Sequence, residues 1–318
     1  MSTNSQNEVR FRIDCHYHEF SNLYTCDVDF LNEKFPSSEH AYQFAKAFIV
    51  NDDRKMNTIR NTKTPFQAMH IGKSVFAKGS VNETKWNKIK YYVMCNIVKR
   101  KFQQNENLMH AMQATAPRSI VEATAHLYWG AGTQYRTGEN AMGKILQRVR
   151  DKIDQPTLLV GDSITTRISN FSISNSLPYE CVPWSGAGID ILFRIAESIS
   201  DNDSKIIFLG GTNDLAFNNQ ALPYPLINGV DGTCKSRPAK KVVKRLECKL
   251  KSFFKQRPNV SFKISEILPR YDQISLIFEL SEVQKAVVKF NDGIKATVAT
   301  FDNKYNIMLI NTYTEMSN

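Results

Sequence analysis

The sequence predicts two domains of different fold class. The first is a mainly α domain over residues 10–152, and the second is an α/β domain with a doubly wound parallel sheet over residues 157–318. Apolar residues recur at helical spacing through most of the first half. Short apolar runs then alternate with helical stretches, which is typical of a parallel sheet covered on both faces. Pro156 marks the change between the two patterns.

The elements follow in order along the chain. The expected helices of the first domain cover residues 37–50, 84–102, 107–114 and 140–150. The expected strands of the second domain cover residues 158–160, 206–209, 261–264 and 307–310, with helices over 189–199 and 239–254. A chain of 318 residues with 42% hydrophobic residues can bury two such cores.

Composition favours an intracellular protein, cytoplasmic or nuclear, without membrane attachment. The first ten residues are polar, and no apolar run reaches membrane-spanning length. The six cysteines form no C-x-x-C pair, so reduced thiols are expected rather than a zinc ribbon or a disulfide framework. His16 and His18 are too few for a metal site, and no metal or cofactor is expected.

The positive charge is uneven. Residues 1–155 hold 22 Lys and Arg against 15 Asp and Glu, a net charge of +7 out of the total of +10. A basic half suits a phosphate-bearing ligand or nucleic acid, and a generic basic surface is the alternative. The oligomeric state is left open.

The first candidate site lies on the helix expected over residues 37–50. Ser37 or Ser38 is suited to cap its N-terminus. Glu39, Gln43 and Lys46 follow at i, i+4 and i+7 and form one polar stripe. The first-turn position of Glu39 favours an ionised carboxylate, suited to stabilise a cationic transition state rather than to act as a general acid. On spacing alone, a solvated helix face is the simpler interpretation.

The second candidate is YWGAG followed by a helix. Gly130 and Gly132 let backbone approach a ligand closely, and Trp129 offers a flat face to a base. Asn140 begins a helix whose free N–H groups suit a phosphate. Taken singly, the pattern also fits a glycine turn with a core tryptophan and a capping asparagine.

Together these segments resemble the NADAR (YbiA-like) family. Other matching segments, in chain order, are FSNLY (20–24), Pro65 with Gly72, Trp86, KFQQNENL (101–108), IVEAT (120–124) and GENAMGKILQRVR (138–150). So many ordered matches are far more specific than any one motif. One position departs: many members carry Asp shortly before the WG pair, where this chain has His126.

The resemblance implies an α-helical domain that hydrolyses N-glycosidic bonds. Substrate types in the family are phosphoribosylamino intermediates of riboflavin synthesis and ADP-ribose attached to guanine bases. The resemblance places catalytic roles on Glu39, Lys46, Trp129 and Asn140, and substrate binding on Asn22, Trp86, Gly130 and Gly132.

Chemistry suggests how these side chains would act. Glu39 would stabilise an oxocarbenium-like state. Lys46 would bind phosphate or help the departing base to accept a proton. Trp129 would stack on the base, and Asn140 would hold a ribose hydroxyl or a phosphate.

The second domain resembles the SGNH/GDSL hydrolases. Ser163 follows the strand in LLVGDSI, at the sheet edge where α/β active sites lie. Ser163 matches the nucleophile, and Gly188 and Asn213 match oxyanion-hole positions. All six histidines lie in the first domain, so the family's catalytic base is missing, and a carboxylate such as Asp214 is a much weaker base. We expect a degenerate binding or scaffold module; a truncated chain, or a hydrolase that borrows a base from the first domain, are the alternatives.

Two classes of function remain. The first is an N-glycosidase acting on a ribosyl or ADP-ribosyl nitrogen-base conjugate. The second is a catalytically weak protein that binds nucleotide or nucleic acid and carries a degenerate hydrolase module. The expected partner is a nucleotide-like or ADP-ribosyl substrate, with nucleic acid as a further candidate.

Overall fold

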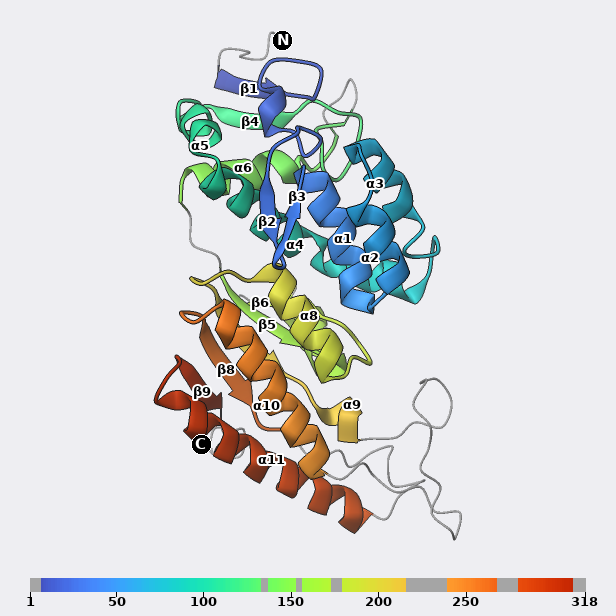
Figure 1. Cartoon of the computed structure of the whole chain (residues 1–318), viewed down its shortest axis with the longest axis vertical. Helices are drawn as coiled ribbons and strands as arrows, with labels where there is room; N and C mark the ends of the chain where they lie inside the picture. The colour runs from blue at the N-terminus through green and yellow to red at the C-terminus, as the bar shows by residue number, and fades with distance from the viewer. Residues whose placement is uncertain are drawn as a thin grey trace. The chain divides into compact units, whose positions relative to one another are not determined.

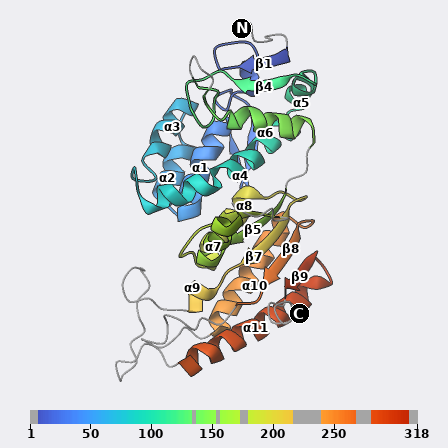
Figure 2. The same ribbon diagram turned by 180° about the vertical axis from the view of Figure 1, so that it is seen from behind.

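The computed structural model describes residues 7–132, 137–152, 156–172, 179–215, 239–267 and 280–310. The chain divides into two compact units, residues 1–155 and 156–318 (Figures 1 and 2). None of the helices in the described ranges combines the length and apolar character that crossing a bilayer requires.

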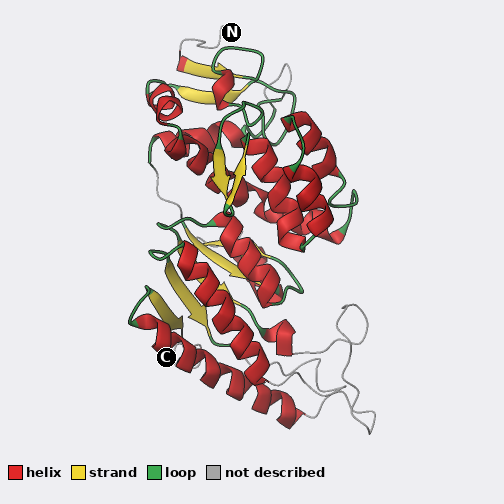
Figure 3. Ribbon diagram, in the orientation of Figure 1, coloured by secondary structure: helices red, strands yellow, loops and turns green. Residues whose placement is uncertain are grey.

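In the N-terminal unit, helices surround α1, and the described strands form two small sheets (Figure 3). The helices are α1 (Ser38–Val50), α2 (Asp53–Arg60), α3 (Pro65–Lys73), α4 (Val81–Gln104), α5 (Glu106–Gln113) and α6 (Ala141–Arg150), with a short 3-10 helix η2 (His18–Phe20). Parallel strands β1 (Glu8–Phe11) and β4 (Ser119–Glu122) form one sheet, and antiparallel strands β2 (Val28–Phe30) and β3 (Glu33–Phe35) form the other.

All four helices expected in this unit are present, with ends displaced by three residues at most. The four short strands and helices α2 and α3 are additional. Helix α3 has a local start signal, because Thr64 and Gln67 form a reciprocal capping box with Pro65 in the first turn. The unit is therefore less purely helical than the expectation.

Helix α1 begins as its sequence dictates, but it is buried on both sides. The Ser37 hydroxyl caps the helix by accepting from the His40 N–H. Its polar stripe is not a solvated face, since Glu39 is 8% and Gln43 4% exposed. Helices α2, α3 and α4 all pack against α1.

The C-terminal unit contains a parallel five-stranded sheet in the order β6-β5-β7-β8-β9. The strands are β5 (Thr157–Gly161), β6 (Tyr179–Pro183), β7 (Lys205–Leu209), β8 (Ser261–Ser265) and β9 (Ile307–Ile310). The helices are α7 (Ser163–Ser172), α8 (Ile189–Ile199), α9 (Thr212–Leu215), α10 (Ala239–Gln256) and α11 (Leu280–Asp302). Helices α8, α10 and α11 lie on one face and α7 on the other (Figures 1 and 2), which confirms the α/β expectation.

The strand order sets where a site would form in this unit. Numbered along the chain, the order is 2-1-3-4-5, so the direction of winding reverses between β5 and β7. Ligand sites in such sheets lie beyond the carboxyl ends of the strands at that reversal. Ser163 follows β5 and Asn213 follows β7, so both flank this point. The additional strand is β6, which pairs with β5 at the sheet edge.

Candidate functional site

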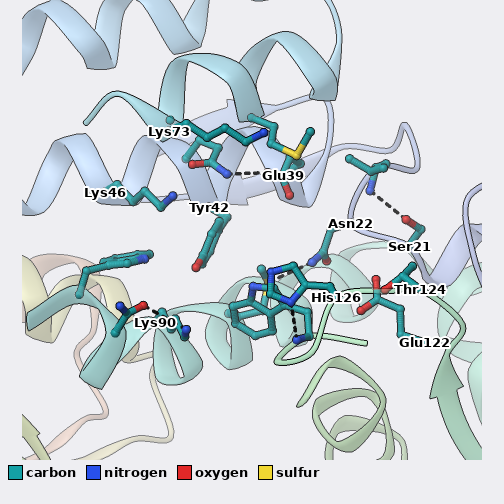
Figure 4. A pocket seen from close by; sticks show the side chains of 18 of the residues that line it. Ser21, Asn22, Glu39, Tyr42, Lys46, Lys73, Lys90, Glu122, Thr124 and His126 are labelled. Carbon is teal, nitrogen blue, oxygen red and sulfur yellow. Dashed lines mark hydrogen bonds between the residues drawn. The ribbon is translucent and has the colours of Figure 1, made fainter. Parts of the chain in front are cut away.

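A cavity of about 500 Å³ lies in the N-terminal unit. Helices α1, α3 and α4, the loop after η2 and the segment after β4 line it (Figure 4). Five of the expected site residues reach it: Asn22, Glu39, Lys46, Trp86 and Trp129. Asn140, Gly130 and Gly132 do not.

Glu39 is the buried carboxylate of α1. Its Oε1 accepts a 2.5 Å hydrogen bond from Gln43 Nε2, and Lys46 and Lys73 lie near enough to favour its ionised form. Burial nevertheless raises the pKa of Glu39 and outweighs these contacts. Loss of water thus acts against the ionised form that the first-turn position of Glu39 favours, and it is the larger effect on this pKa.

Glu122 is a second carboxylate in the same cavity, and the sequence argument did not select it. Burial, followed by the nearby charge of Glu39, raises the pKa of Glu122 to about 7. Its Oε2 is buried without a hydrogen-bond partner. The two carboxylates differ in surroundings, because Glu39 has an amide donor and two lysines beside it. The charge of Glu39 raises the pKa of Glu122, so their titrations are coupled, and the groups beside Glu39 favour its ionised form.

Lysines also line the cavity, and Lys46 and Lys73 lie on the same side of it as Glu39 (Figure 4). Burial lowers the pKa of Lys46 to about 8, although Glu39 and Glu83 favour its charged form. Its ammonium lies 5.3 Å from the centre of the Tyr42 ring. Lys73 and Lys90 also line the cavity. The lysines provide positive charge for an anionic group of a ligand.

Aromatic rings form another part of the wall. Tyr42 packs against Trp86 at 5.2 Å between ring centres and meets Trp129 edge to face at 5.8 Å. Burial raises the pKa of Tyr42 well above its ordinary value, so its hydroxyl stays protonated. These rings offer flat apolar surface to a base.

A buried lysine binds the backbone of the loop that carries Asn22. Lys101 is fully buried, and its ammonium donates to the carbonyls of Glu19 at 2.6 Å and Ser21 at 2.8 Å. The Asn22 carbonyl in turn accepts from the Glu39 N–H at 3.0 Å. Lys101 thus fixes the loop on which the start of α1 rests.

Asn140 has a different place from the one expected. It has a left-handed backbone with φ 51°, and its side chain bonds to β4. Its Nδ2 donates to the Ile120 carbonyl and its Oδ1 accepts from the Glu122 N–H, both at 2.9 Å. Both polar atoms of the amide thus bind the backbone of β4, and one of them holds the Glu122 N–H.

Gly130 and Gly132 have packing roles in the same region. A Cβ on Gly130 would lie 2.1 Å from Thr124 Oγ1, so glycine lets this cavity residue approach. Gly132 has φ +79°, which favours glycine. Neither is among the residues that line the cavity.

The residues expected to form a hydrolase site in the C-terminal unit lie beyond the carboxyl ends of the strands. Asn213 Nδ2 donates to Asp162 Oδ2, beside Ser163, and to the carbonyl of Ala187, beside Gly188. Asp214 accepts from the Ile189 N–H at 2.8 Å and pairs with Arg245. The sequence of this unit contains no histidine.

Within the described ranges, no three His, Cys, Asp or Glu side chains come together as a metal site. No disulfide joins the described cysteines.

The sequence of the N-terminal unit defines its family. The NADAR domain matches residues 10–154, and the chain belongs to the NADAR family through this half of its length. N-glycosidase YbiA of Escherichia coli is 30% identical over 138 residues, which are 43% of this chain and 82% of that protein. A riboflavin biosynthesis protein of Vibrio vulnificus is 29% identical over 136 residues, 42% of this chain and 35% of that protein. The NMR structure of E. coli YbiA covers 46% of this chain and 84% of its own, with 28% identity and a TM-score of 0.41.

The contact of Gly72 with Gln43 gives a first prediction. A Cβ on Gly72 would lie 1.8 Å from Gln43 Oε1, so Gly72→Ala must displace the amide that bonds Glu39. We expect a loss of about 1–3 kcal/mol in the free energy of unfolding, the usual cost of overpacking. In a Gln43→Ala background the loss should nearly vanish, and denaturant unfolding of the four proteins gives the coupling. Equal losses in both backgrounds would contradict the contact.

The raised pKa of Glu122 gives a second prediction. Between pH 5 and 7 the folded chain keeps a proton on Glu122 that the unfolded chain has released, since its ordinary pKa is 4.5. The folded state binds more protons, so the free energy of unfolding should fall as pH rises, by about 2 kcal/mol over this range. Glu122→Gln should remove most of this fall. Urea unfolding followed by tryptophan fluorescence in a Trp184→Phe background reports on the N-terminal unit, and an unchanged slope in Glu122→Gln would refute the assignment.

Proposed function

We propose that this protein is an N-glycosidase that hydrolyses the bond between a ribose and a nitrogen base. One observation carries the proposal: a buried carboxylate, Glu39, and a half-buried one, Glu122, share one cavity in surroundings that favour different protonation states. The N-glycosidase names of relatives in the family support the same reaction class.

The reaction needs an acid and an anion. Cleavage of an N-glycosidic bond builds positive charge on the ribose, and ionised Glu39 stabilises that charge. Protonated Glu122 donates its proton to the departing base nitrogen, as its pKa of about 7 allows near neutral pH. Water adds to the ribose carbon, and its released proton passes to Glu39. The products are free base and the ribose hemiacetal.

The substrate class follows from the rest of the wall. Lys46, Lys73 and Lys90 suit a phosphate, and the rings of Trp86 and Trp129 suit a base. A phosphoribosylamino intermediate of riboflavin synthesis and ADP-ribose linked to guanine both have these parts. The riboflavin biosynthesis name of one relative supports the first, and the basic half of the chain supports an ADP-ribosylated nucleic acid.

The assay uses both substrates with the full chain. Release of free base or of ADP-ribose should be lowered by two or more orders of magnitude in Glu39→Gln, which keeps the shape and removes the charge. Glu122→Gln should lower the rate of this release by about 10²- to 10⁴-fold, because it removes the proton donor. Wild-type activity should fall as pH rises through about 7, because Glu122 loses its proton, and the residual activity of Glu122→Gln should lack that fall.

Glu106→Gln is the control, because Glu106 is an exposed carboxylate outside the cavity that pairs with His110. It should leave activity unchanged. Binding of either substrate without turnover, at an affinity that Glu39→Gln does not alter, would favour the alternative of a nucleotide-binding protein.

We propose that the C-terminal unit is a hydrolase-like module without esterase activity. Ser163 has no histidine in its own unit to activate it, and Asp214 is held by the Ile189 N–H and Arg245. The full chain should not turn over acetyl or aryl esters, and Ser163→Ala should leave N-glycosidase activity unchanged. Ester turnover that disappears in Ser163→Ala would overturn this proposal. Replacing His110 and His126 would then test whether the first unit supplies the base.

A further inference from the structure

His126 lies on the cavity wall and holds the turn that carries Trp129. Its Nδ1 accepts from the backbone N–H groups of Tyr128 at 3.2 Å and Trp129 at 3.1 Å. Its carbonyl accepts from the Gly130 N–H at 2.9 Å. The side chain therefore caps the turn much as the oxygen of Asn or Asp caps a turn or a helix.

Both Nδ1 bonds require a particular state of the ring. A nitrogen that accepts two N–H groups carries no proton of its own, so the ring is neutral and Nε2 bears its hydrogen. Burial, and then the charge of Lys90, lower the pKa of His126 in agreement with this state. Protonation of Nδ1 would place three N–H groups against one another and break both bonds.

The ionisable groups that share the cavity with His126 come from several elements. They are Arg12 after β1, Glu39, Tyr42 and Lys46 of α1, Lys73 of α3, Glu83 and Lys90 of α4, and Glu122 at the end of β4. Of these, Lys90 is the one whose charge contributes to the lowered pKa of the ring.

The Trp129 backbone is fixed on two sides. The His126 ring holds its N–H, and its carbonyl accepts from the Met142 N–H at the start of α6 at 3.0 Å. The indole meets Tyr42, another residue of the cavity wall, edge to face. Loss of the His126 bonds leaves the indole anchored from one side alone.

We propose that His126 is the positioning residue for Trp129: in its neutral form it holds the indole ready to stack on the base of the substrate, and protonation releases it. The substrate part of this inference rests on the proposed N-glycosidase function. The conformational part concerns the unliganded protein and stands without it.

Three variants test the acceptor at this position. In His126→Asn the side-chain oxygen takes the place of Nδ1 and does not titrate. In His126→Gln the amide reaches the place of Nε2 instead, and His126→Ala provides no acceptor. If His126 acts by placing an acceptor at the position of Nδ1, then His126→Asn should preserve the position of Trp129 and His126→Gln should not.

The first measurement is the fluorescence of Trp129 as the single tryptophan, in a Trp86→Phe, Trp184→Phe background, between pH 4.5 and 8. In the chain that keeps His126, the emission of Trp129 should change with a midpoint below pH 6.5, the ordinary pKa of histidine, because the pKa of His126 is lowered. The transition should be absent in His126→Asn. His126→Ala and His126→Gln should show the low-pH emission throughout.

The second measurement is steady-state kinetics in chains that keep all three tryptophans. At pH 7.5, His126→Ala and His126→Gln should raise KM about tenfold, the scale of one lost base-stacking contact, with kcat changed about twofold or less. His126→Asn should keep the wild-type KM. Wild-type KM in His126→Ala, or an asparagine variant as impaired as the glutamine variant, would overturn the proposal. Absence of turnover in every chain, with the fluorescence pattern intact, would refute the N-glycosidase function and leave the turn mechanism standing.

Discussion

The removal of water from ionisable side chains around one cavity is the constraint on which the N-terminal unit depends. Glu39, Glu122, Lys46 and Lys101 all lose solvent on folding, and burial is the largest cause of each pKa shift. Buried charge is costly unless fixed dipoles or opposite charges replace the water. The fold supplies both: carbonyls bind Lys101, and an amide and two lysines lie beside Glu39.

Close approaches of backbone and side chain hold these groups in place. A Cβ on Gly143 would lie 2.1 Å from the Ile120 carbonyl, so glycine lets α6 lie against β4 where Asn140 spans the two. The Glu122 N–H is bound by Asn140 and its carbonyl accepts from Ala131. The backbone that carries the acid is thereby fixed on both sides by segments that follow it in the chain, which is the kind of support that catalytic geometry requires.

The sequence predicts the parts of this architecture that depend on local pattern. Helical periodicity identified α1, α4, α5 and α6, and short apolar runs identified four of the five strands of the C-terminal sheet. The site was predicted only in part. The stripe of Glu39, Gln43 and Lys46 predicted one wall of the cavity. Glu122, however, lies in a short strand that is bound by β1 and by the Asn140 side chain, and local sequence spacing does not reveal such contacts. For the same reason Asn140 was assigned to a ligand, because its left-handed backbone and its bonds to β4 arise from tertiary structure.

Unpaired polar atoms on the cavity wall bear on the proposed substrate. In the described part of the chain, Asn22 Oδ1, Gln43 Oε1, Glu122 Oε2 and Thr124 Oγ1 are buried without hydrogen-bond partners, and all four residues line this cavity. An unpaired buried polar group costs about 1–3 kcal/mol. Three of the four are carbonyl or carboxylate oxygens, so the group that relieves them must bring hydrogen-bond donors. Ribose hydroxyls and an amino-substituted base have such donors, whereas a phosphate has its partners among the lysines. If the proposed function holds, the ribose and the base would pair with these oxygens and the phosphate with the lysines, so the two ends of the substrate would contact different parts of the wall.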